Sequence, residues 1–470
     1  MKRIYLFLAA AAMLLTTACS NDDAANGVAL DSQTTAANLA VGFDTYTANA
    51  TRAVQEGVMT TDKLQTTGFG VFAVQSDNTT YASDQKTDFM WNQKVQWSAN
   101  SWTYSPLKYW PNETNTDSQT PAAAAASSNM DRLSFFAYAP YVAEKASTYD
   151  GSLTDVIYAA DPDDHPTTDA HNSSSTGIVG VSANDNVTTD PYVWYVVSSK
   201  PSESVDLLWG VAPAGGLSYE TVYPNYKSTG VATLNVGEGL PLINLIKPNK
   251  DQKMKFLFKH ALARIGLSVV AAVDQISAGG ELGTETKIAV ESVTITEVTG
   301  TKRLFTSGRL NLKNETNGTA KWEETTGAPV TFTVNATNEL SNEIKWDTDV
   351  ATTIGHSEFV GVDNQEKKVI RKDGDKTKAE QYFMVIPSHA NTYLNVAITY
   401  YVFTEDAKVD GGYAVTKNVI NKTVEIPNLT NNKAYNLKLV LGMTSVKLDA
   451  EVADWQIDGT SIVDLPRNNE

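Results

Sequence analysis

Cysteine and histidine, the side chains on which many metal and redox sites depend, are nearly absent from this sequence. Its 470 residues include one cysteine, Cys19, and five histidines. A single cysteine excludes an intramolecular disulfide and a metal cluster held by several thiolates. No GxSxG, HExxH or glycine-rich phosphate loop occurs either. We therefore expect a protein that is not an enzyme and that carries no cofactor.

Basic clusters and long amphipathic helical patterns are lacking as well. Lys and Arg total 37 against 54 Asp and Glu, which gives a net charge of −17 at pH 7. Nucleic-acid binding is not expected, because phosphate backbones are bound by clustered Lys and Arg. The acidic balance favours solubility.

The sequence contains instead many short β-branched or aromatic runs, separated by Gly, Asn, Asp and Thr. The clearest of these runs are 68–75, 255–273, 287–298, 329–334, 382–387 and 393–403. Because no helices alternate with them, they predict an all-β protein built of β-sandwiches. The polar stretch LIKPNKDQK (245–253) divides the chain, and we place a domain boundary near residue 250. The boundary could also lie later, since FLFKHALARIGLSV (256–269) could close the first sandwich or open the second.

The start of the chain has the pattern of a bacterial lipoprotein signal. Lys2 and Arg3 precede an apolar run, 4–15, and small residues then lead into Cys19. This run is too short to span a membrane, which takes about 20 residues. The pattern predicts that Cys19 is acylated and becomes the mature N-terminus, although an ordinary secretory signal with an incidental cysteine is the alternative. The SNDD that follows resembles the acidic tag of lipoproteins sent to the outer face of the outer membrane.

Two segments contain candidate ligands for a metal ion. Acidic side chains and two histidines crowd 161–171, from Asp161 to His171, but the segment lacks the ligand order and glycine turn of an EF-hand. We favour a solvated loop over a calcium site there. His260 lies in an apolar run, which indicates a hydrogen-bonded core histidine rather than a ligand.

Four tryptophans gather within a short stretch, Trp91, Trp97, Trp102 and Trp110. Such a cluster could stack against sugars. Aromatic residues beside short strands more often fill the core of a sandwich, and we favour that interpretation.

Six motifs follow one another along the chain. They are NQKVQW (92–97), WTYSPLKYWP (102–111), LSFFAYAP (133–140), DLLWGVA (206–212), FKHALARIGLSV (258–269) and NNKAYNLKLVL (431–441). With the lipoprotein signal, they resemble the landmarks of the Mfa-like fimbrillin family, the pilins and associated subunits of type V pili. The resemblance implies two transthyretin-like β-sandwiches in tandem, export as a lipoprotein, trimming by an arginine-specific protease and polymerisation by strand exchange. The family also includes tips and anchors, so the position in a fibre is left open.

The segment before Arg52 fits that mechanism. Leu39, Val41 and Phe43 lie on one side of an extended stretch and predict a first strand. A cut after Arg52, just before Ala53, would remove its covalent tie to the following chain. Loss of the strand would expose a hydrophobic groove and an unpaired sheet edge, which is a template for a strand from another chain. The alternative is that Arg52 is an ordinary loop residue.

The C-terminal region alternates in the way that a donor strand requires. Val446, Leu448, Ala450 and Val452 share one face, and charged residues occupy the other. Burying the two valines and the leucine would contribute about 5–9 kcal/mol before costs, with about 1 kcal/mol for each main-chain hydrogen bond. The alternative is that this segment is simply the last strand of its own domain.

The sequence thus predicts four consecutive parts. They are a signal peptide at 1–18, a propeptide with a removable strand at 19–52, an N-terminal sandwich at 53–250 and a C-terminal sandwich with the donor tail at 251–470. The predicted protein is a pilin of the cell surface that supports adhesion. Its partners would be other fimbrial subunits, the outer membrane through the lipid, and an arginine-specific protease. The alternative is a tip adhesin or glycan-binding lipoprotein that stays lipidated and uncut.

Overall fold

The computed structural model describes the greater part of the chain after residue 39. The described residues are 40–47, 58–76, 80–85, 87, 89–111, 132–142, 176–183, 190–213, 236–245, 253–272, 286–298, 300, 303–314, 318–326, 330–335, 337, 339–346, 359–360, 365–410, 412–442, 446–454 and 463–464. Within these ranges the regular elements are strands, apart from helix α1 (Thr61–Thr67) and short 3-10 turns such as η3 (Pro201–Glu203) and η5 (Lys372–Gly374). The all-β prediction is confirmed, and the strands form several sheets. No helix in the described part of the chain is long and apolar enough to cross a membrane.

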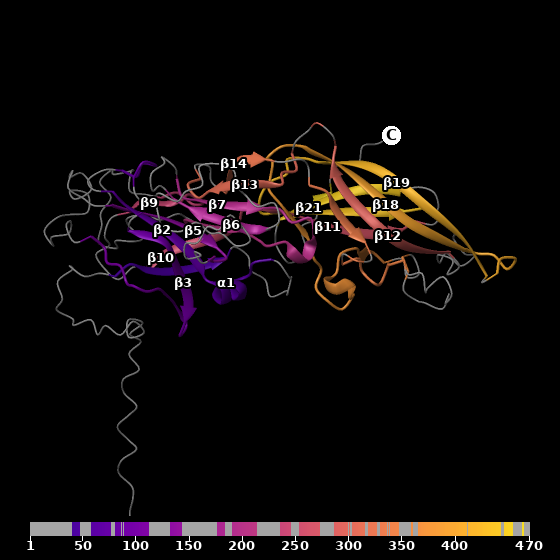
Figure 1. The fold of residues 1–470 in the computed structure, drawn as a ribbon, viewed down its shortest axis with the longest axis horizontal. Helices are drawn as coiled ribbons and strands as arrows, with labels where there is room; N and C mark the ends of the chain where they lie inside the picture. Colours follow the sequence, from indigo (N-terminus) through magenta and orange to yellow (C-terminus); the bar gives the residue numbers. More distant parts are fainter. Residues whose placement is uncertain are drawn as a thin grey trace, which may run out of the picture.

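One half of the molecule is built on an eight-stranded sheet, at the left of Figure 1. Its order is β1-β10-β8-β5-β2-β3-β4, and β9 pairs with β5. The strands are β1 (Gly42–Thr47), β2 (Phe69–Ser76), β3 (Met90–Ser98), β4 (Ser101–Thr103), β5 (Arg132–Ala139), β8 (Leu208–Val211), β9 (Leu242–Leu245) and β10 (Lys253–His260). The order puts β1, the first of the described strands, at one end of the sheet.

Helix α1 connects the segment after β1 to β2. It begins because Thr60 accepts a hydrogen bond from the Lys63 N–H at 3.2 Å, and Asp62 lies in its first turn. It ends at Gly68, whose φ of 73° lies in the left-handed region. A Cβ on Gly68 would lie 2.6 Å from the Val95 carbonyl oxygen. The helix therefore stops where the chain must pass close to β3.

A four-stranded sheet, β14-β13-β7-β6, draws on distant parts of the sequence. It contains β6 (Gly177–Ser182), β7 (Tyr192–Val196), β13 (Ser307–Asn311) and β14 (Lys321–Thr326). Strand β13 pairs with β7 in antiparallel register, Leu310 opposite Val193. The second half of the sequence thus returns to pair with the first.

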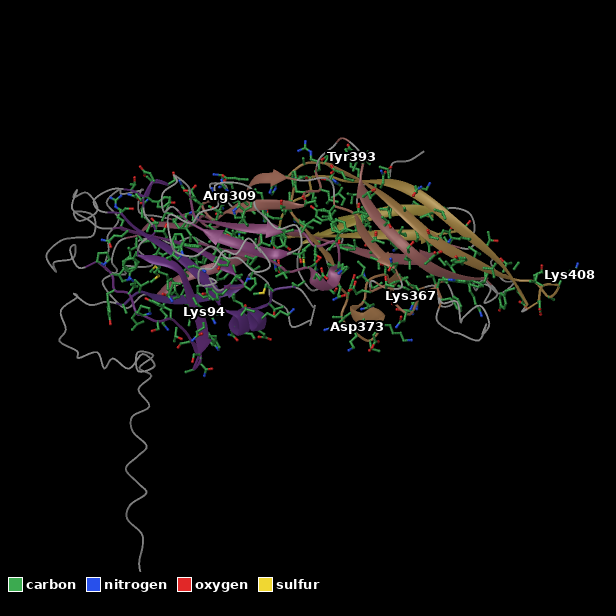
Figure 2. All side chains as sticks on the ribbon, in the orientation of Figure 1. Lys94, Arg309, Lys367, Asp373, Tyr393 and Lys408 are labelled. Atoms are coloured by element: carbon green, nitrogen blue, oxygen red, sulfur yellow. The ribbon has the colours of Figure 1, made fainter. Side chains whose placement is uncertain are left out.

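The other half of the molecule contains two more sheets, at the right of Figure 1. The six-stranded sheet has the order β16-β11-β20-β21-β22, with β17 also paired to β11. Its strands are β11 (Ala263–Ala271), β16 (Lys367–Lys368), β17 (Phe383–Val385), β20 (Lys433–Leu441), β21 (Val446–Asp454) and β22 (Val463–Asp464). The four-stranded sheet β15-β12-β18-β19 consists of β12 (Thr286–Glu297), β15 (Phe332–Asn335), β18 (Thr392–Glu405) and β19 (Tyr413–Ile426). The β18–β19 hairpin extends to the far end of this half, where Lys408 lies (Figure 2).

The chain passes from the first half to the second between two neighbouring strands. Strand β10 belongs to the eight-stranded sheet and β11 to the six-stranded sheet, so the run 256–269 contributes to both. Only Ala261 and Leu262 lie between them. Hydrogen bonds hold this connection on both residues. The Ala261 N–H donates to the Leu207 carbonyl at 2.8 Å, and the Asn432 N–H donates to the Leu262 carbonyl at 2.9 Å. Trp322 Nε1 donates to the Ala261 carbonyl at 3.1 Å.

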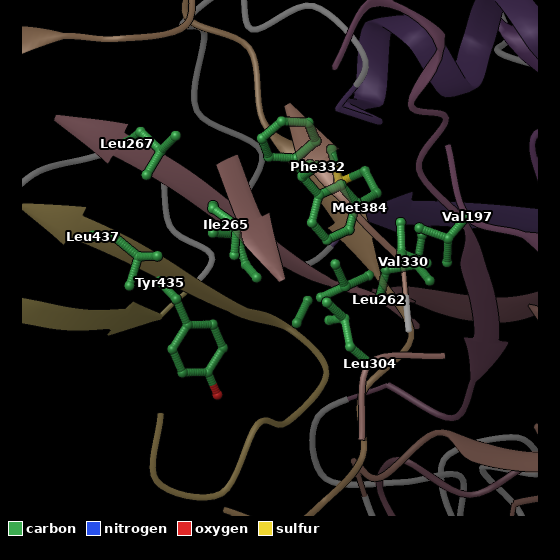
Figure 3. Close-up of a cluster of buried hydrophobic side chains, with 14 of the residues drawn as sticks. Val197, Leu262, Ile265, Leu267, Leu304, Val330, Phe332, Met384, Tyr435 and Leu437 are labelled. Atoms are coloured by element: carbon green, nitrogen blue, oxygen red, sulfur yellow. The ribbon is translucent and has the colours of Figure 1, made fainter. Parts of the chain in front are cut away.

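Two large hydrophobic cores and a small cluster around Ala289, Phe359 and Phe403 lie in the described structure. The larger one runs without interruption from the first half into the second, and Figure 3 shows its side chains around Leu262 at the connection, from Val197 to Tyr435. The smaller core lies under the eight-stranded sheet and is rich in aromatic rings, including Phe43, Phe69 and Phe256. A core shared across the connection favours a single stiff unit over two loosely linked domains.

Candidate functional site: the groove beneath strand β1

Strand β1 is joined to the eight-stranded sheet through one ladder. It lies parallel to β10, with Gly42 opposite Lys253 and Thr47 opposite Phe258. On its other side, the described residues supply an isolated bridge between Ala40 and Tyr109. A strand with so little main-chain pairing is held mainly by its side chains.

Those side chains are buried in the smaller core. Phe43 is 1% exposed. Its ring stacks on Phe256 with centroids 6.0 Å apart and meets Tyr104 edge-on at 5.5 Å and Phe135 at 6.0 Å. Val41 is equally buried. Together they fill the groove beneath β1, and each contributes about 1.5–3 kcal/mol by burial.

The backbone is held at Val41, the residue just before β1. Tyr104 donates its hydroxyl proton to the Val41 carbonyl at 2.7 Å, and the Val41 N–H donates to the Lys108 carbonyl at 2.9 Å. Burial raises the pKa of Tyr104 to about 12, so the phenol stays protonated and remains a donor at physiological pH. Both bonds involve the backbone of residue 41, so they do not depend on its side chain.

Thr45 fits the interior less well than Val41 and Phe43 do. Thr45 is 8% exposed, and its hydroxyl oxygen has no hydrogen-bond partner among the described residues. A buried hydroxyl without a partner costs about 1–3 kcal/mol. On the outer face, Asp44 lies 4.0 Å from Lys255, and both side chains are half exposed. An exposed pair at this distance contributes at most about 1 kcal/mol.

The chain behind β1 is anchored by a buried acid–histidine pair. Asp206 is fully buried, and its Oδ2 lies 2.7 Å from His260 Nδ1. The same oxygen accepts a hydrogen bond from the Met59 N–H at 2.9 Å. The interpretation of His260 as a hydrogen-bonded core residue is confirmed. In sequence order, Arg52 falls between β1 and this anchor at Met59.

Several predicted positions lie outside the described residues. They are Cys19, Leu39, Arg52, Ala53 and the acidic segment 161–171. In the part of the chain that the structure describes, no group of three or more His, Cys, Asp or Glu side chains could hold a metal ion.

The tryptophan cluster belongs to the interior. Trp110 is 1% exposed and Trp102 is 7% exposed. Trp97 meets Trp102 edge-on at 5.3 Å, and Trp91 packs in the same way against Phe72 at 5.6 Å. The core interpretation is confirmed, and a sugar-stacking platform built on Trp102 and Trp110 is wrong because their faces are covered.

The predicted donor segment forms β21 in a sheet of its own half. It pairs antiparallel with β20 over its full length, from Val446 opposite Leu441, and with β22 at Val452. Val446 is 3% exposed, whereas Leu448, Ala450 and Val452 are partly buried against the larger core. The alternation of faces is confirmed, and in this structure the segment occupies the position of a strand within its own sheet.

Three residues of the site have no obvious signal in the sequence. Tyr104 and Asp206 are single polar residues in apolar surroundings, and Phe256 is one of several alternating aromatics. The separation of 147 residues between Met59 and Asp206 shows why pattern alone does not connect them.

Comparison with known proteins gives one partial sequence match and one clearly shared fold. No protein-family model matches the chain. It is 30% identical over 121 residues to the fimbrium subunit Fim1C of Phocaeicola vulgatus, a match that spans 25% of this chain and 27% of that relative. A fimbrial protein from Bacteroides vulgatus shares the fold with a TM-score of 0.55 at 18% identity, covering 89% of this chain and 99% of that one. A fimbrial assembly protein from Parabacteroides distasonis aligns with a TM-score of 0.31 at 9% identity, over 91% of this chain and 99% of that one.

The fold and the sequence match agree with the resemblance carried by the six motifs. The chain thus shares its fold with a fimbrial protein over most of its length, and over 121 residues its sequence is similar to that of a fimbrium subunit.

Proposed function

We propose that this chain is a structural subunit of a cell-surface fimbria, activated by a cut after Arg52 that releases β1. The observation that carries the proposal is the construction of β1 itself. Its inward-facing residues Phe43 and Thr45, and Val41 just before it, are almost fully buried, yet its ladder joins it to β10 alone. Once its covalent tie is cut, β1 is held by contacts that another strand can reproduce.

The anchor at Met59 supports a cut at this place. The Asp206 carboxylate holds the Met59 backbone in the interior beside His260. A new N-terminus at Ala53 would therefore begin a few residues before a fixed point of the fold. The loss of β1 would leave α1 and β2 in place and open only the groove.

An open groove favours capture of another strand. Removing β1 leaves β10 as an unpaired edge and exposes Phe69, Phe135 and Phe256 beneath it. Exposed edges and large apolar patches of this kind mark sites of strand addition. The donor would come from another fimbrial subunit, and the predicted donor segment is β21 with its apolar face of Val446, Leu448, Ala450 and Val452.

The remaining parts of the proposal concern architecture and export. Two transthyretin-like sandwiches in tandem would account for the two halves, with the passage between them at Ala261 and Leu262. Acylation at Cys19 would tether the precursor to the outer membrane, at the cell surface. The cut after Arg52 would then separate the lipid and β1 from the subunit that enters the fibre.

The test is digestion of the purified precursor with an arginine-specific protease. We expect a product that begins at Ala53 and forms oligomers larger than the uncut protein on size-exclusion chromatography. The matched control is Arg52→Lys, which keeps the charge but resists such a protease and should stay monomeric. A product that begins elsewhere, or that stays monomeric after the cut, would contradict the proposal. A protein that keeps Cys19 in isolated fibres would instead be an anchor.

A further inference from the structure

The hairpin of β18 and β19 gathers exposed hydrophobic side chains. Tyr393, Val409, Val415 and Val419 are 37%, 41%, 49% and 63% exposed, whereas the rest of the described chain adds two more exposed large hydrophobic residues. In Figure 2, Tyr393 lies near the base of this hairpin and Lys408 at its tip. Apolar side chains that gather at one place on the surface mark an interaction site.

Strand β19 presents an open main chain. It lies at the end of its four-stranded sheet, and β18 is its ladder partner in the described structure. The Val298 N–H donates to the Tyr393 carbonyl at 2.9 Å, so the main chain of Tyr393 points away from β19. Because these directions alternate along a strand, the even-numbered residues of β18 and β19 bond to each other. The odd-numbered residues of β19 therefore direct their N–H and carbonyl groups to the outer edge.

We propose that β19 of a second copy of this chain pairs with this edge in antiparallel direction, with the two-fold axis at Asn421. In this register Lys417 of each copy stands opposite Glu425 of the other, and Val419 stands opposite Thr423. The contact would join two subunits side by side. It goes beyond the proposed function, because it forms on the uncut chain and does not require β1 to leave.

The charges of β19 are arranged for a second copy of the same strand. Lys417 and Glu425 lie four residues to either side of Asn421, on the same face. Two antiparallel copies centred there form two pairs of opposite charge, one on each side of the axis. A centre at Lys417 or at Lys422 would place two lysines in direct opposition, which is unfavourable. A centre at Val419 would leave both charges without an opposite charge across the edge.

Both charged side chains are already positioned by their own chain. Lys417 Nζ lies 2.8 Å from Glu291 Oε2. Glu425 Oε1 accepts hydrogen bonds from Asn391 Nδ2 at 2.7 Å and from the Tyr393 hydroxyl at 3.1 Å. Side chains that are ordered before binding lose less conformational entropy when they pair. In the dimer each lysine would lie between two carboxylates, one from each copy.

The remaining side chains suit an antiparallel pair. Most residues from 415 to 423 are exposed, on both faces of the strand, so the edge is open to a partner. Val419 would pack on Thr423 of the other copy, and two β-branched residues in opposition stabilise a sheet. The two Asn421 amides meet at the axis and can exchange hydrogen bonds. On the inner face Lys422 stands opposite Ile420, where its methylene chain can lie along the isoleucine with the ammonium group in water.

One contact of this kind is weak. It pairs a single strand from each copy over 416–426, and its charge pairs stay at the surface. We expect a dissociation constant above about 100 μM, so the uncut chain stays monomeric at the micromolar concentrations of size-exclusion chromatography. Subunits arrayed along two fibres would make many such contacts at once, which raises the affinity steeply. This consequence for fibres rests on the proposed function, whereas the contact itself does not.

Carbodiimide cross-linking of the uncut chain tests the contact, since this reagent joins a lysine to a carboxylate that touches it. The full chain with Cys19→Ser, which cannot be acylated, is mixed with a heavy-isotope-labelled copy at about 300 μM, above the expected dissociation constant. Within one chain Lys417 and Glu425 lie about 26 Å apart along β19, so a link between them joins two copies. We expect Lys417–Glu425 peptides that combine labelled and unlabelled chains. The Lys417–Glu291 link within one chain is the internal control.

Charge reversal sharpens the test. Glu425→Lys places lysines in opposition on both sides of the axis and should weaken the dimer, measured by analytical ultracentrifugation, at least about tenfold. The double variant Lys417→Glu, Glu425→Lys restores two pairs of opposite charge and should restore most of the dimer. The matched control is Glu405→Lys, which makes the same change of charge at an exposed position outside the paired segment and should leave the dimer unchanged.

Val419→Pro provides a measurement that does not depend on charge. Residue 419 directs its N–H to the outer edge, so proline removes a bond of the dimer and none of the β18–β19 ladder. This variant should keep its fold, checked by circular dichroism, and lose dimer at least about tenfold. Equal dimer formation by Val419→Pro, dimers without the Lys417–Glu425 link, or no mixed link at all would each overturn the proposal. None of these outcomes bears on the cut after Arg52, which digestion tests separately.

Discussion

Strands β1 and β21 contrast in what holds them. The inner side chains of β1 are nearly inaccessible, but its ladder runs to one neighbour. Strand β21 pairs with a strand on each side, yet most of its inner side chains are only partly buried. Burial of side chains selects which sequence can occupy a site, whereas main-chain pairing accepts nearly any sequence. The groove under β1 is therefore more selective for the sequence of the strand that fills it than the position of β21 is.

The largest expected difference between the strands is in the cost of truncating their inner side chains. Phe43→Ala should lower the free energy of unfolding of the uncut protein by about 3–5 kcal/mol, because it empties a fully buried aromatic site. Leu448→Ala should cost about 2 kcal/mol or less, since that side chain is partly exposed. Urea unfolding followed by tryptophan fluorescence measures both. Equal losses would remove the contrast.

The second-largest loss of stability should come from removing the Asp206 carboxylate, which anchors the Met59 backbone behind β1. Asp206→Ala leaves the Met59 N–H and His260 without their shared acceptor, and should cost about 3 kcal/mol of stability. Hydrogen exchange at the Met59 amide should speed up in the same variant. The matched control is Asp44→Ala on the exposed face of β1, expected to change stability by about 0.5 kcal/mol or less. Unchanged exchange at Met59 would show that the carboxylate is not the anchor.

The hydrogen bond from Tyr104 to the Val41 backbone should contribute less to stability, and its effect should be confined to β1. Tyr104→Phe removes the hydrogen bond to the Val41 carbonyl and keeps the ring, so it should cost about 1 kcal/mol. After the cut, β1 should leave about fivefold faster, which can be followed by mass spectrometry of the released peptide. A release rate equal to that of the natural chain would mean that the side chains alone retain the strand.

The smallest effect is a pH dependence in the half that holds β21. Burial lowers the pKa of His389, while a hydrogen bond with the Ala320 backbone acts in the opposite sense. Because the folded pKa is depressed, the contribution of this residue is present above the unfolded value near 6.5 and is lost as pH falls below it. The natural chain should thus lose more thermal stability between pH 7.5 and 5 than His389→Asn does. Asn also tolerates the φ of 49° at this position. Parallel pH profiles for the two proteins would contradict this.

Prediction from the sequence succeeded where a short pattern was sufficient. The alternation of Val41 with Phe43, and of Val446 with Leu448, correctly assigned the inner faces of the described parts of β1 and β21, because side chains two apart on a strand share a face. His260 was interpreted correctly for a similar reason: a histidine within an apolar run is usually buried and hydrogen-bonded. The tryptophans were rightly assigned to the core from their place among short strands.

Pairing between distant segments could not be predicted in the same way. Which distant segments pair depends on which compact arrangement buries the most apolar surface while leaving few buried polar groups without hydrogen bonds. Examples are the parallel pairing of β10 with β1, the return of β13 to β7, and the contact of Asp206 with Met59. This condition involves the whole chain, so the pattern of residues in any single segment does not reveal which distant segment it pairs with.

The alternation of apolar and polar residues was enough to predict the all-β fold class, because it is a local property of the chain. The role of each strand in the sheets followed from long-range packing. Phe43 fills the groove because the rings of Phe69, Phe135 and Phe256, from three other strands, pack around it. A hydrophobic side chain determines that it will be buried, and its neighbours determine where.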